Sequence, residues 1–224
     1  MSENYLAVML TSRGRRCLVV GGGEVAHRKV QDALGAGLRV VVVAPSLVPA
    51  LRDLAERGDI AWKERAFCPE DVRGMFLVFA AATPHVNSEV CRAAREAGVL
   101  VNVVDHPEMS DFTSPAVLHR GPVTIAVSTG GASPALAARI RDRVAALVGE
   151  EVGEWAALLG RFRQRVQEAV RDETVRHELL RRAGQFDGAS LIARGEKGAL
   201  EALLESWLQE ARRGPRGGED AGRG

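Results

Sequence analysis

The stretch Cys17-Leu18-Val19-Val20-Gly21-Gly22-Gly23-Glu24-Val25-Ala26 decides the fold class of this chain. A short β-branched run leads directly into three glycines, and a helical pattern follows. This order predicts a strand, a tight turn and a helix N-terminus, whose unpaired N–H groups can bind a pyrophosphate. The spacing Gly21-x-Gly23-x-x-Ala26 matches the dinucleotide-binding fingerprint with alanine at its third position. The alternative is a glycine turn that only packs against its neighbours.

The first half of the chain alternates apolar runs with helical patterns. The run Arg39–Ala44 (RVVVVA) is continuously apolar after its first residue, as in a parallel strand buried on both faces. We expect strands at 18–20, 39–44, 60–64, 75–81 and 100–104, and helices at 25–34, 47–57 and 86–97. Strands separated by helices indicate βαβ units. The prediction is an α/β fold with a Rossmann-like parallel sheet in residues 1–113.

The pattern changes after Asp105. Residues 106–122 contain three prolines, which predict a loop or a crossover between domains. A strand at 123–128 then leads into Thr129-Gly130-Gly131-Ala132-Ser133-Pro134 and a helix that extends to about Val148. Ser133 suits the N-cap of this helix and Pro134 its first turn. This is a second glycine-rich junction between a strand and a helix, and therefore a second candidate anion site.

Residues 150–211 are predicted to form a helical C-terminal domain. Its apolar residues recur at helical spacing: Trp155, Leu158, Leu159, Phe162, Val166, Val170, Leu179, Leu180, Leu200, Leu203, Leu204 and Leu208. Small helices that pack on each other or on a partner chain fit this pattern. The last stretch, residues 212–224, is rich in glycine and arginine and is predicted to be disordered.

Composition excludes several classes of protein. The 224 residues are 46% hydrophobic and 26% charged, and the formal net charge is +1. A large sequence-independent nucleic-acid interface would show a marked basic excess. No apolar run approaches the roughly 20 residues that span a bilayer, and we see no signal peptide. Three scattered cysteines without a CxxC pair favour a reducing, cytoplasmic setting.

The residues that follow the second and fourth predicted strands bear on cofactor choice. Ala44-Pro45-Ser46 offers neither the acidic residue that holds a ribose in many NAD enzymes nor an arginine for a 2′-phosphate, so the residues do not separate NAD from NADP. Ser46 is either a ribose ligand or an ordinary helix cap. The small residues around Ala82 and Thr83 either let a cofactor approach or form a tight turn.

Asp105 follows a predicted buried strand, on the edge of the sheet where ligands bind in doubly wound folds. A carboxylate there is costly unless it is hydrogen-bonded or catalytic. Asp105 is a candidate general base or metal ligand, and the alternative is a turn or helix cap. His106 is a candidate anion or metal ligand, although a single histidine is more often structural.

The second junction carries Ser128, Thr129, Gly130 and Gly131, and the helix behind it carries Arg139, Arg141 and Arg143. Arg139 and Arg143 share a helix face. Backbone N–H groups together with guanidinium groups suit carboxylates or phosphates. Arg120 and His119 add possible anion contacts in the preceding loop. The alternative is a capped helix with a solvated basic face.

Taken together, these motifs resemble precorrin-2 dehydrogenase, the dehydrogenase and ferrochelatase module of siroheme synthase. The residues that carry the resemblance are GGGEVAHRK (21–29), AATP (81–84 with Ala80 before it), NVVDHPEMSDFTSPA (102–116) and GPVTIAVSTGGASPALAARIR (121–141). They cover roughly residues 5–150, with a weaker helical likeness beyond. The last two motifs are far more specific than the glycine fingerprint.

The resemblance implies oxidation of precorrin-2 to sirohydrochlorin with NAD, and in some members insertion of ferrous iron. It also implies a homodimer, with residues 114–149 as a dimerisation and substrate segment. The family's key aspartate corresponds to Asp105. Its cofactor contacts correspond to a set of turn residues: Gly21, Gly22, Gly23, Glu24, Val25, Pro45 and Ser46. Precorrin-2 carries eight carboxylates, which the second junction and the arginines are suited to bind.

Two departures limit what the resemblance implies. Ser110 occupies a position where many relatives have cysteine, so a metal role for that cysteine does not apply here. The chain has no methyltransferase domain, so we expect another protein to make precorrin-2. Which residues would contact a metal is not predicted. An NAD-sensing regulatory module and a chelatase without dehydrogenase activity are the competing functions.

Overall fold

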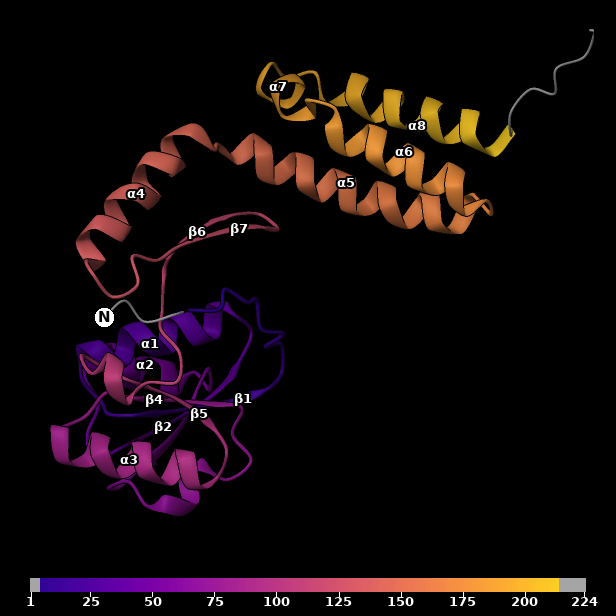
Figure 1. Ribbon diagram of the computed structural model, residues 1–224. Helices are drawn as coiled ribbons and strands as arrows, with labels where there is room; N and C mark the ends of the chain where they lie inside the picture. Colours follow the sequence, from indigo (N-terminus) through magenta and orange to yellow (C-terminus); the bar gives the residue numbers. More distant parts are fainter. Residues whose placement is uncertain (1–4, 214–224) are drawn as a thin grey trace, which may run out of the picture. The chain divides into compact units, whose positions relative to one another are not determined.

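A computed structural model of the protein describes residues 5–213. The chain divides into two compact units, Met1–Ser114 and Pro115–Gly224, which are described separately. The predicted end of the first domain at residue 113 lies one residue from this division. The first unit holds a five-stranded sheet in the order β3-β2-β1-β4-β5 (Figure 1). Its strands are β1 (Arg16–Val20), β2 (Arg39–Ala44), β3 (Ala61–Glu64), β4 (Leu77–Ala80) and β5 (Leu100–Val103).

Every pairing in this sheet is parallel, which confirms the predicted Rossmann-like α/β fold. Strand β1 is central, and Val20 is aligned with Val43 of β2 and with Ala80 of β4. Three strands therefore end together at one edge of the sheet. The glycine turn, the segment after β2 and the segment after β4 all begin at that edge, which is why residues far apart in sequence can form one site.

Alternate residues of a strand point to opposite faces of the sheet, so each face presents apolar side chains that a helix covers. On one face, Val19 and Val42 pack against α1 (Glu24–Gly35) and α2 (Pro49–Glu56). On the other, Val20 and Val43 pack against α3 (Pro84–Glu96). Figure 1 shows α1 and α2 on one side of the strands and α3 on the other. Two short 3₁₀ segments, η1 (Pro69–Val72) and η2 (Pro107–Met109), complete the unit.

A buried carboxylate fixes the loop between β3 and η1. Asp71 is only 3% exposed and accepts hydrogen bonds from Lys63 at 2.7 Å and from Arg65 at 2.6 and 2.7 Å. The backbone N–H and the thiol of Cys68 also donate to it, at 3.1 and 3.3 Å. Burial alone would raise the pKa of Asp71, but these donors hold that pKa well below its ordinary value.

We expect Asp71→Asn to lower the free energy of unfolding by about 2 kcal/mol at pH 7. The figure is lower than for a fully buried pair, because Lys63 and Arg65 are about two-fifths exposed and regain water. A carboxyl group whose pKa is lower in the folded protein than in the unfolded chain stabilises the fold at pH values above the unfolded-state pKa, about 3.9. This contribution is lost as the pH falls from that value towards the folded-state pKa. The difference between the proteins should therefore shrink below about pH 4.

Urea unfolding of wild type, Asp71→Asn and the exposed control Asp53→Asn, repeated from pH 7 downwards, checks this expectation. Asp53 lies on α2 in the same unit, so the control removes one carboxylate without removing a buried network. Equal unfolding midpoints for all three proteins at pH 7 would contradict it.

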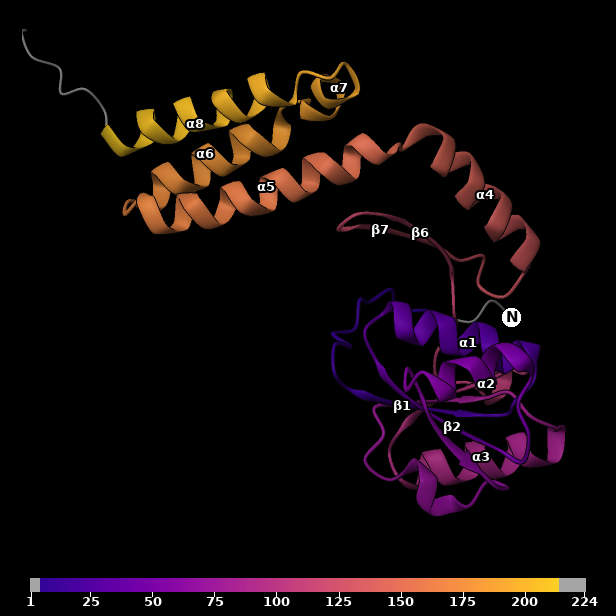
Figure 2. The same cartoon turned by 180° about the vertical axis from the view of Figure 1, so that it is seen from behind.

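The described part of the second unit, residues 115–213, contains a two-stranded antiparallel sheet and five helices. Its elements are β6 (Ala116–Arg120), β7 (Val123–Val127), α4 (Pro134–Leu147), α5 (Glu150–Ala169), α6 (Glu173–Gln185), α7 (Gly188–Ala193) and α8 (Lys197–Arg213). Helices α5, α6 and α8 lie side by side in both views (Figures 1 and 2). Their core includes Trp155 and Trp207, which both meet Phe186 edge to face, at 6.4 and 5.5 Å between ring centroids. The predicted helical C-terminal region is confirmed.

Three expectations need correction. Residues 116–120, predicted as part of a loop or crossover, form β6 and pair with β7. Strands β4 and β5 are shorter than expected, and they end at Ala80 and Val103. Arg212 and Arg213, assigned to a disordered tail, belong to α8; residues 214–224 lie outside the described part. Among residues 5–213, no helix is both long enough and apolar enough to cross a bilayer.

Candidate functional site

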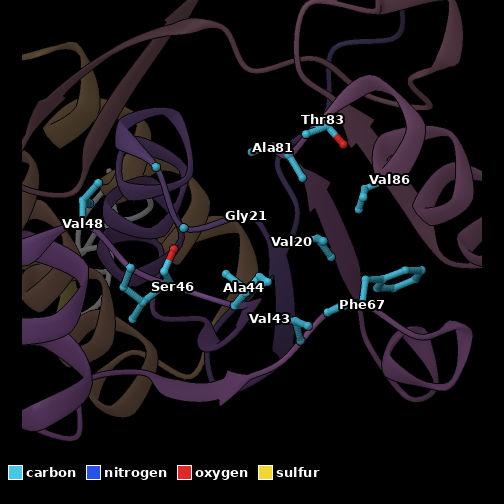
Figure 3. Close-up of a pocket in the computed structure, with 16 residues that line it drawn as sticks. Val20, Gly21, Val43, Ala44, Ser46, Val48, Phe67, Ala81, Thr83 and Val86 are labelled. Atoms are coloured by element: carbon cyan, nitrogen blue, oxygen red, sulfur yellow. The ribbon is translucent and has the colours of Figure 1, made fainter.

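A cavity of about 570 Å³ opens at the carboxyl edge of the parallel sheet. It is bounded by the glycine turn after β1, the segment after β2, the residues after β3 and the turn after β4. Figure 3 shows Ser46 and Val48 on one side of Gly21, and Thr83, Val86 and Phe67 on the other. The lining is mostly apolar side chains and backbone, as in pockets that enclose a nucleoside.

In the glycine turn, the fold itself requires glycine at positions 21 and 22. Gly21 has a φ of +129°, and a Cβ there would lie 2.2 Å from the carbonyl oxygen of Ala81. A Cβ on Gly22 would lie 1.9 Å from the carbonyl oxygen of Ser46. The Gly22 carbonyl also accepts from the Val48 N–H at 2.8 Å. Both glycines are needed because the segments after β2 and β4 approach the turn closely.

Gly23 differs from its two neighbours. It is the N-cap of α1, with φ −92° and ψ −174°, a conformation open to any residue. No heavy atom lies within 4 Å of the place where its Cβ would be. The first intrahelical bond is His27 N–H to the Gly23 carbonyl at 2.9 Å, so the N–H groups of Glu24, Val25 and Ala26 have no partner within the helix. The open space beside Gly23 and these donors together fit the pyrophosphate of a dinucleotide.

Two side chains, buried Asn87 and half-buried Trp62, hold the cavity walls in place. Asn87 is only 5% exposed, and its side-chain oxygen accepts a hydrogen bond from the Ala82 N–H at 2.9 Å. The Trp62 indole N–H donates to the Ala44 carbonyl at 3.0 Å. These bonds fix the turn after β4 and the end of β2. Neither residue was a predicted site residue, because each acts through backbone that only the sheet order brings to the cavity.

Seven of the nine predicted cofactor residues line the cavity: Gly21, Gly22, Gly23, Pro45, Ser46, Ala82 and Thr83. Glu24 and Val25 do not line it and lie in the first turn of α1. The prediction missed the other lining residues: Val20, Val43, Ala44, Leu47, Val48, Ala66, Phe67, Ala81 and Val86. Ala66 and Phe67 follow the third strand, and the rule that ligands lie beyond strand ends was a usable signal for them.

Asp105 stands in an unusual backbone conformation directly after β5. Its φ is +61°, and it is the only described residue other than glycine with a positive φ. Aspartate tolerates this left-handed region better than most residues, and such conformations concentrate at functional sites. The side chain is exposed, so the expected cost of burying this carboxylate does not arise. Asp105 is not part of the cavity lining.

Ser110 braces the turn that carries Asp105. Its hydroxyl accepts from the Val103 N–H at 2.9 Å and lies 3.0 Å from the His106 carbonyl oxygen, to which it can donate. The His106 N–H donates to the Val103 carbonyl at 3.2 Å. Ser110, at the position where many relatives have cysteine, therefore has a structural role in this chain. The His106 ring contacts Glu108, with Nδ1 2.9 Å from Oε1.

The remaining predicted substrate residues lie in the second unit. Ser128 accepts from the Gly130 N–H at 3.2 Å, and the Thr129 hydroxyl accepts from the Ser133 N–H at 3.0 Å. Gly130 and Gly131 have positive φ values, and Ser133 caps α4 as predicted, accepting from the Leu136 N–H. The junction is thus an ordered turn ahead of a capped helix.

Arg120 and Arg139 differ in what they contact. The Arg120 guanidinium donates to the Val148 carbonyl at 2.9 Å and pairs with Glu150 at 3.2 Å, so it links β6 to the start of α5. Arg139 is exposed on α4. Within residues 5–213, no group of three or more histidine, cysteine, aspartate or glutamate side chains is arranged to hold a metal ion.

Three family models match successive parts of the chain. A model of NAD(P)-binding domains matches residues 8–116, a model of the central part of sirohaem biosynthesis proteins matches 120–147, and a model of the sirohaem synthase dimerisation region matches 151–208. The first model covers the whole parallel sheet and the cavity. The second covers the glycine junction and α4.

Curated relatives and a solved structure agree with these models. The chain is 40% identical over 202 residues to a siroheme synthase of Methylococcus capsulatus and 38% identical over 206 residues to one of Nitrosococcus oceani, covering 90% of this chain in each case. It spans 43% and 44% of those proteins, less than half their length. The solved structure of SirC, a precorrin-2 dehydrogenase, matches 93% of this chain and 100% of its own, with 26% identity and a TM-score of 0.74.

Proposed function

Because this chain belongs to the precorrin-2 dehydrogenase family, which also forms a module of siroheme synthases, we propose that it oxidises precorrin-2 to sirohydrochlorin with NAD. One observation carries the proposal. The carboxyl edge of a single parallel sheet presents both a cavity suited to a dinucleotide and, after β5, the left-handed turn of Asp105.

The cofactor fit rests on the open backbone at Gly23 and on the lining of the cavity. NAD supplies the hydride acceptor when it is bound. The unpaired N–H groups at the start of α1 would bind its pyrophosphate, and the apolar lining, which includes Val43, Phe67 and Val86, would pack against the rest of the molecule. Ser46 binds a ribose hydroxyl. Glu24 and Val25 contribute backbone rather than side chains.

Asp105 is the proposed catalytic residue. The oxidation removes two hydrogens from precorrin-2, one as a hydride and one as a proton. A carboxylate oxygen of Asp105 accepts the proton, and the bond that held it supplies the electron pair of the new double bond. The Ser110 brace keeps the carboxylate at the sheet edge. His106, Arg120, Ser128, Thr129, Gly130, Gly131 and Arg139 are proposed to contact the acidic side chains of the substrate.

Assembly and location belong to the same proposal. The match of residues 151–208 to a dimerisation region supports a homodimer. The three free cysteines support a reducing compartment, the cytoplasm. Iron insertion would be a further activity, and the assay below treats it separately.

Anaerobic turnover of precorrin-2 tests the proposal. The optical spectrum is followed with NAD, with NADP and without nucleotide, and ferrous iron is added after the first reaction is complete. NAD-dependent formation of sirohydrochlorin supports the dehydrogenase. A further spectral change faster than the protein-free control would add a chelatase. Folded protein that binds NAD but oxidises nothing would overturn the proposal and favour a nucleotide sensor.

A further inference from the structure

A half-buried charged group lies on the helix that begins at the glycine turn. Lys29 is on α1, six residues after Gly23, and its side chain is half-buried. Its ammonium donates a hydrogen bond to the Ser114 hydroxyl at 3.0 Å. It also lies 5.4 Å from the centroid of the Phe79 ring, which packs edge to face on Phe112.

This ammonium is not neutralised by a salt bridge. In the part of the chain that the structure describes, no carboxylate lies within 4.0 Å of Lys29 Nζ. Its one hydrogen-bond partner is a neutral hydroxyl, and an ammonium has three N–H donors. Burial lowers the pKa of Lys29, and Arg28 lowers it further, while the charges of Asp32 and Asp105 act in the opposite direction. A partly desolvated cation with spare donors is a ready partner for an anion.

Lys29 lies beside strands that lead to the proposed reaction site. Phe79 is in β4, two residues before Ala81, which lines the cavity. Asp105 follows β5, the strand next to β4. The ammonium therefore lies beside the strand that leads to the cofactor cavity, and that strand is paired with the one that Asp105 follows. Exposed lysines on a solvated helix face do not have this setting.

We propose that Lys29 is a binding residue for a carboxylate side chain of the substrate, placed next to the reaction centre. The inference rests on the proposed function and names one contact within it. The ammonium donates to Ser114 and lies 5.4 Å from the centroid of the Phe79 ring, so it is held in place before the ligand arrives, and a carboxylate would complete its hydrogen bonding. Ser114 orients the ammonium and does not satisfy its charge.

Three variants test the contact. Lys29→Met keeps an unbranched stem and removes the charge, Lys29→Arg keeps the charge, and Arg28→Met removes a charge from the exposed neighbouring position on the same helix. For Lys29→Met we expect a KM for precorrin-2 raised about tenfold to 100-fold, with kcat changed less than about threefold. Lys29→Arg should recover much of the loss, and Arg28→Met should behave as wild type.

Two further measurements separate this inference from the proposed function. Binding of uroporphyrin, a stable octacarboxylic tetrapyrrole, is followed by absorbance without turnover and should weaken in Lys29→Met alone. NAD affinity should be equal in all four proteins. If the wild type shows no turnover but Lys29→Met weakens uroporphyrin binding, the proposed reaction fails and the anion contact stands. Unchanged KM and uroporphyrin affinity in Lys29→Met, or a loss confined to kcat, would overturn the contact.

Discussion

Replacing Asp105 with asparagine is expected to lower precorrin-2 turnover by about 100-fold to 10,000-fold, the usual contribution of a general base. The affinity for NAD should not change, because Asp105 does not line the cavity. Asparagine is the informative substitution because the backbone at residue 105 is left-handed, with φ +61°. Asparagine accepts that conformation as readily as aspartate, so only the charge and the proton acceptor are removed.

Asp105→Ala serves as the comparison. Alanine in the left-handed region costs roughly 1–2 kcal/mol, so this variant should lose stability as well as turnover. Turnover, NAD affinity and melting temperature are measured for both variants. If catalysis depends on the carboxylate, Asp105→Asn is inactive at wild-type stability. A regulatory nucleotide sensor would be nearly indifferent to either change, and turnover of Asp105→Asn within about threefold of wild type would exclude the proposed base.

The sheet was predictable because its signals are local. The run Cys17–Val20 followed by three glycines specifies a strand, a turn and a helix without any knowledge of the rest of the chain. The apolar run Arg39–Ala44 similarly indicates a strand buried on both faces, and β2 has the predicted bounds. The N-cap role of Ser133 was also visible, because capping depends on residues within one turn.

The rest of the cavity depends on contacts between distant segments. Phe67 reaches the site because it follows β3, which pairs with β2 at the edge of the sheet, and no short pattern around Phe67 encodes that pairing. Asn87 and Trp62 act through hydrogen bonds to backbone five and 18 residues away. Strand β6 was missed because it lies in a proline-rich stretch, and only its pairing with β7 makes it a strand.

The conformation of Asp105 could not have been read from its neighbours. The sequence indicated a carboxylate at a strand end, and the interpretation assumed that burial would make it costly. The structure exposes the side chain and puts the constraint in the backbone instead, where Ser110 and the bond between His106 and Val103 hold the turn. A residue held in a rare conformation by its surroundings is a stronger reason to test it than its charge alone.

Replacing Gly23 with valine is expected to abolish NAD binding while the first unit stays folded. The backbone of Gly23 is extended, and no atom lies within 4 Å of the position that a Cβ would take. The valine side chain would therefore occupy the open space in front of the unpaired N–H groups of α1, where the pyrophosphate is proposed to bind. Valine is a poorer N-cap than glycine, so the melting temperature should fall only slightly.

Gly22→Ala is the contrasting variant, because its Cβ would lie 1.9 Å from the Ser46 carbonyl oxygen and must disturb the fold itself. We expect Gly22→Ala to lower the melting temperature far more than Gly23→Val does. Calorimetric titration with NAD, alongside thermal unfolding of each protein, distinguishes the two effects. Gly23→Ala should give an intermediate affinity, since a single methyl group fills less of the space. Wild-type NAD affinity in Gly23→Val would mean that the cofactor does not approach the start of α1, and the site would have to be sought elsewhere on the sheet edge.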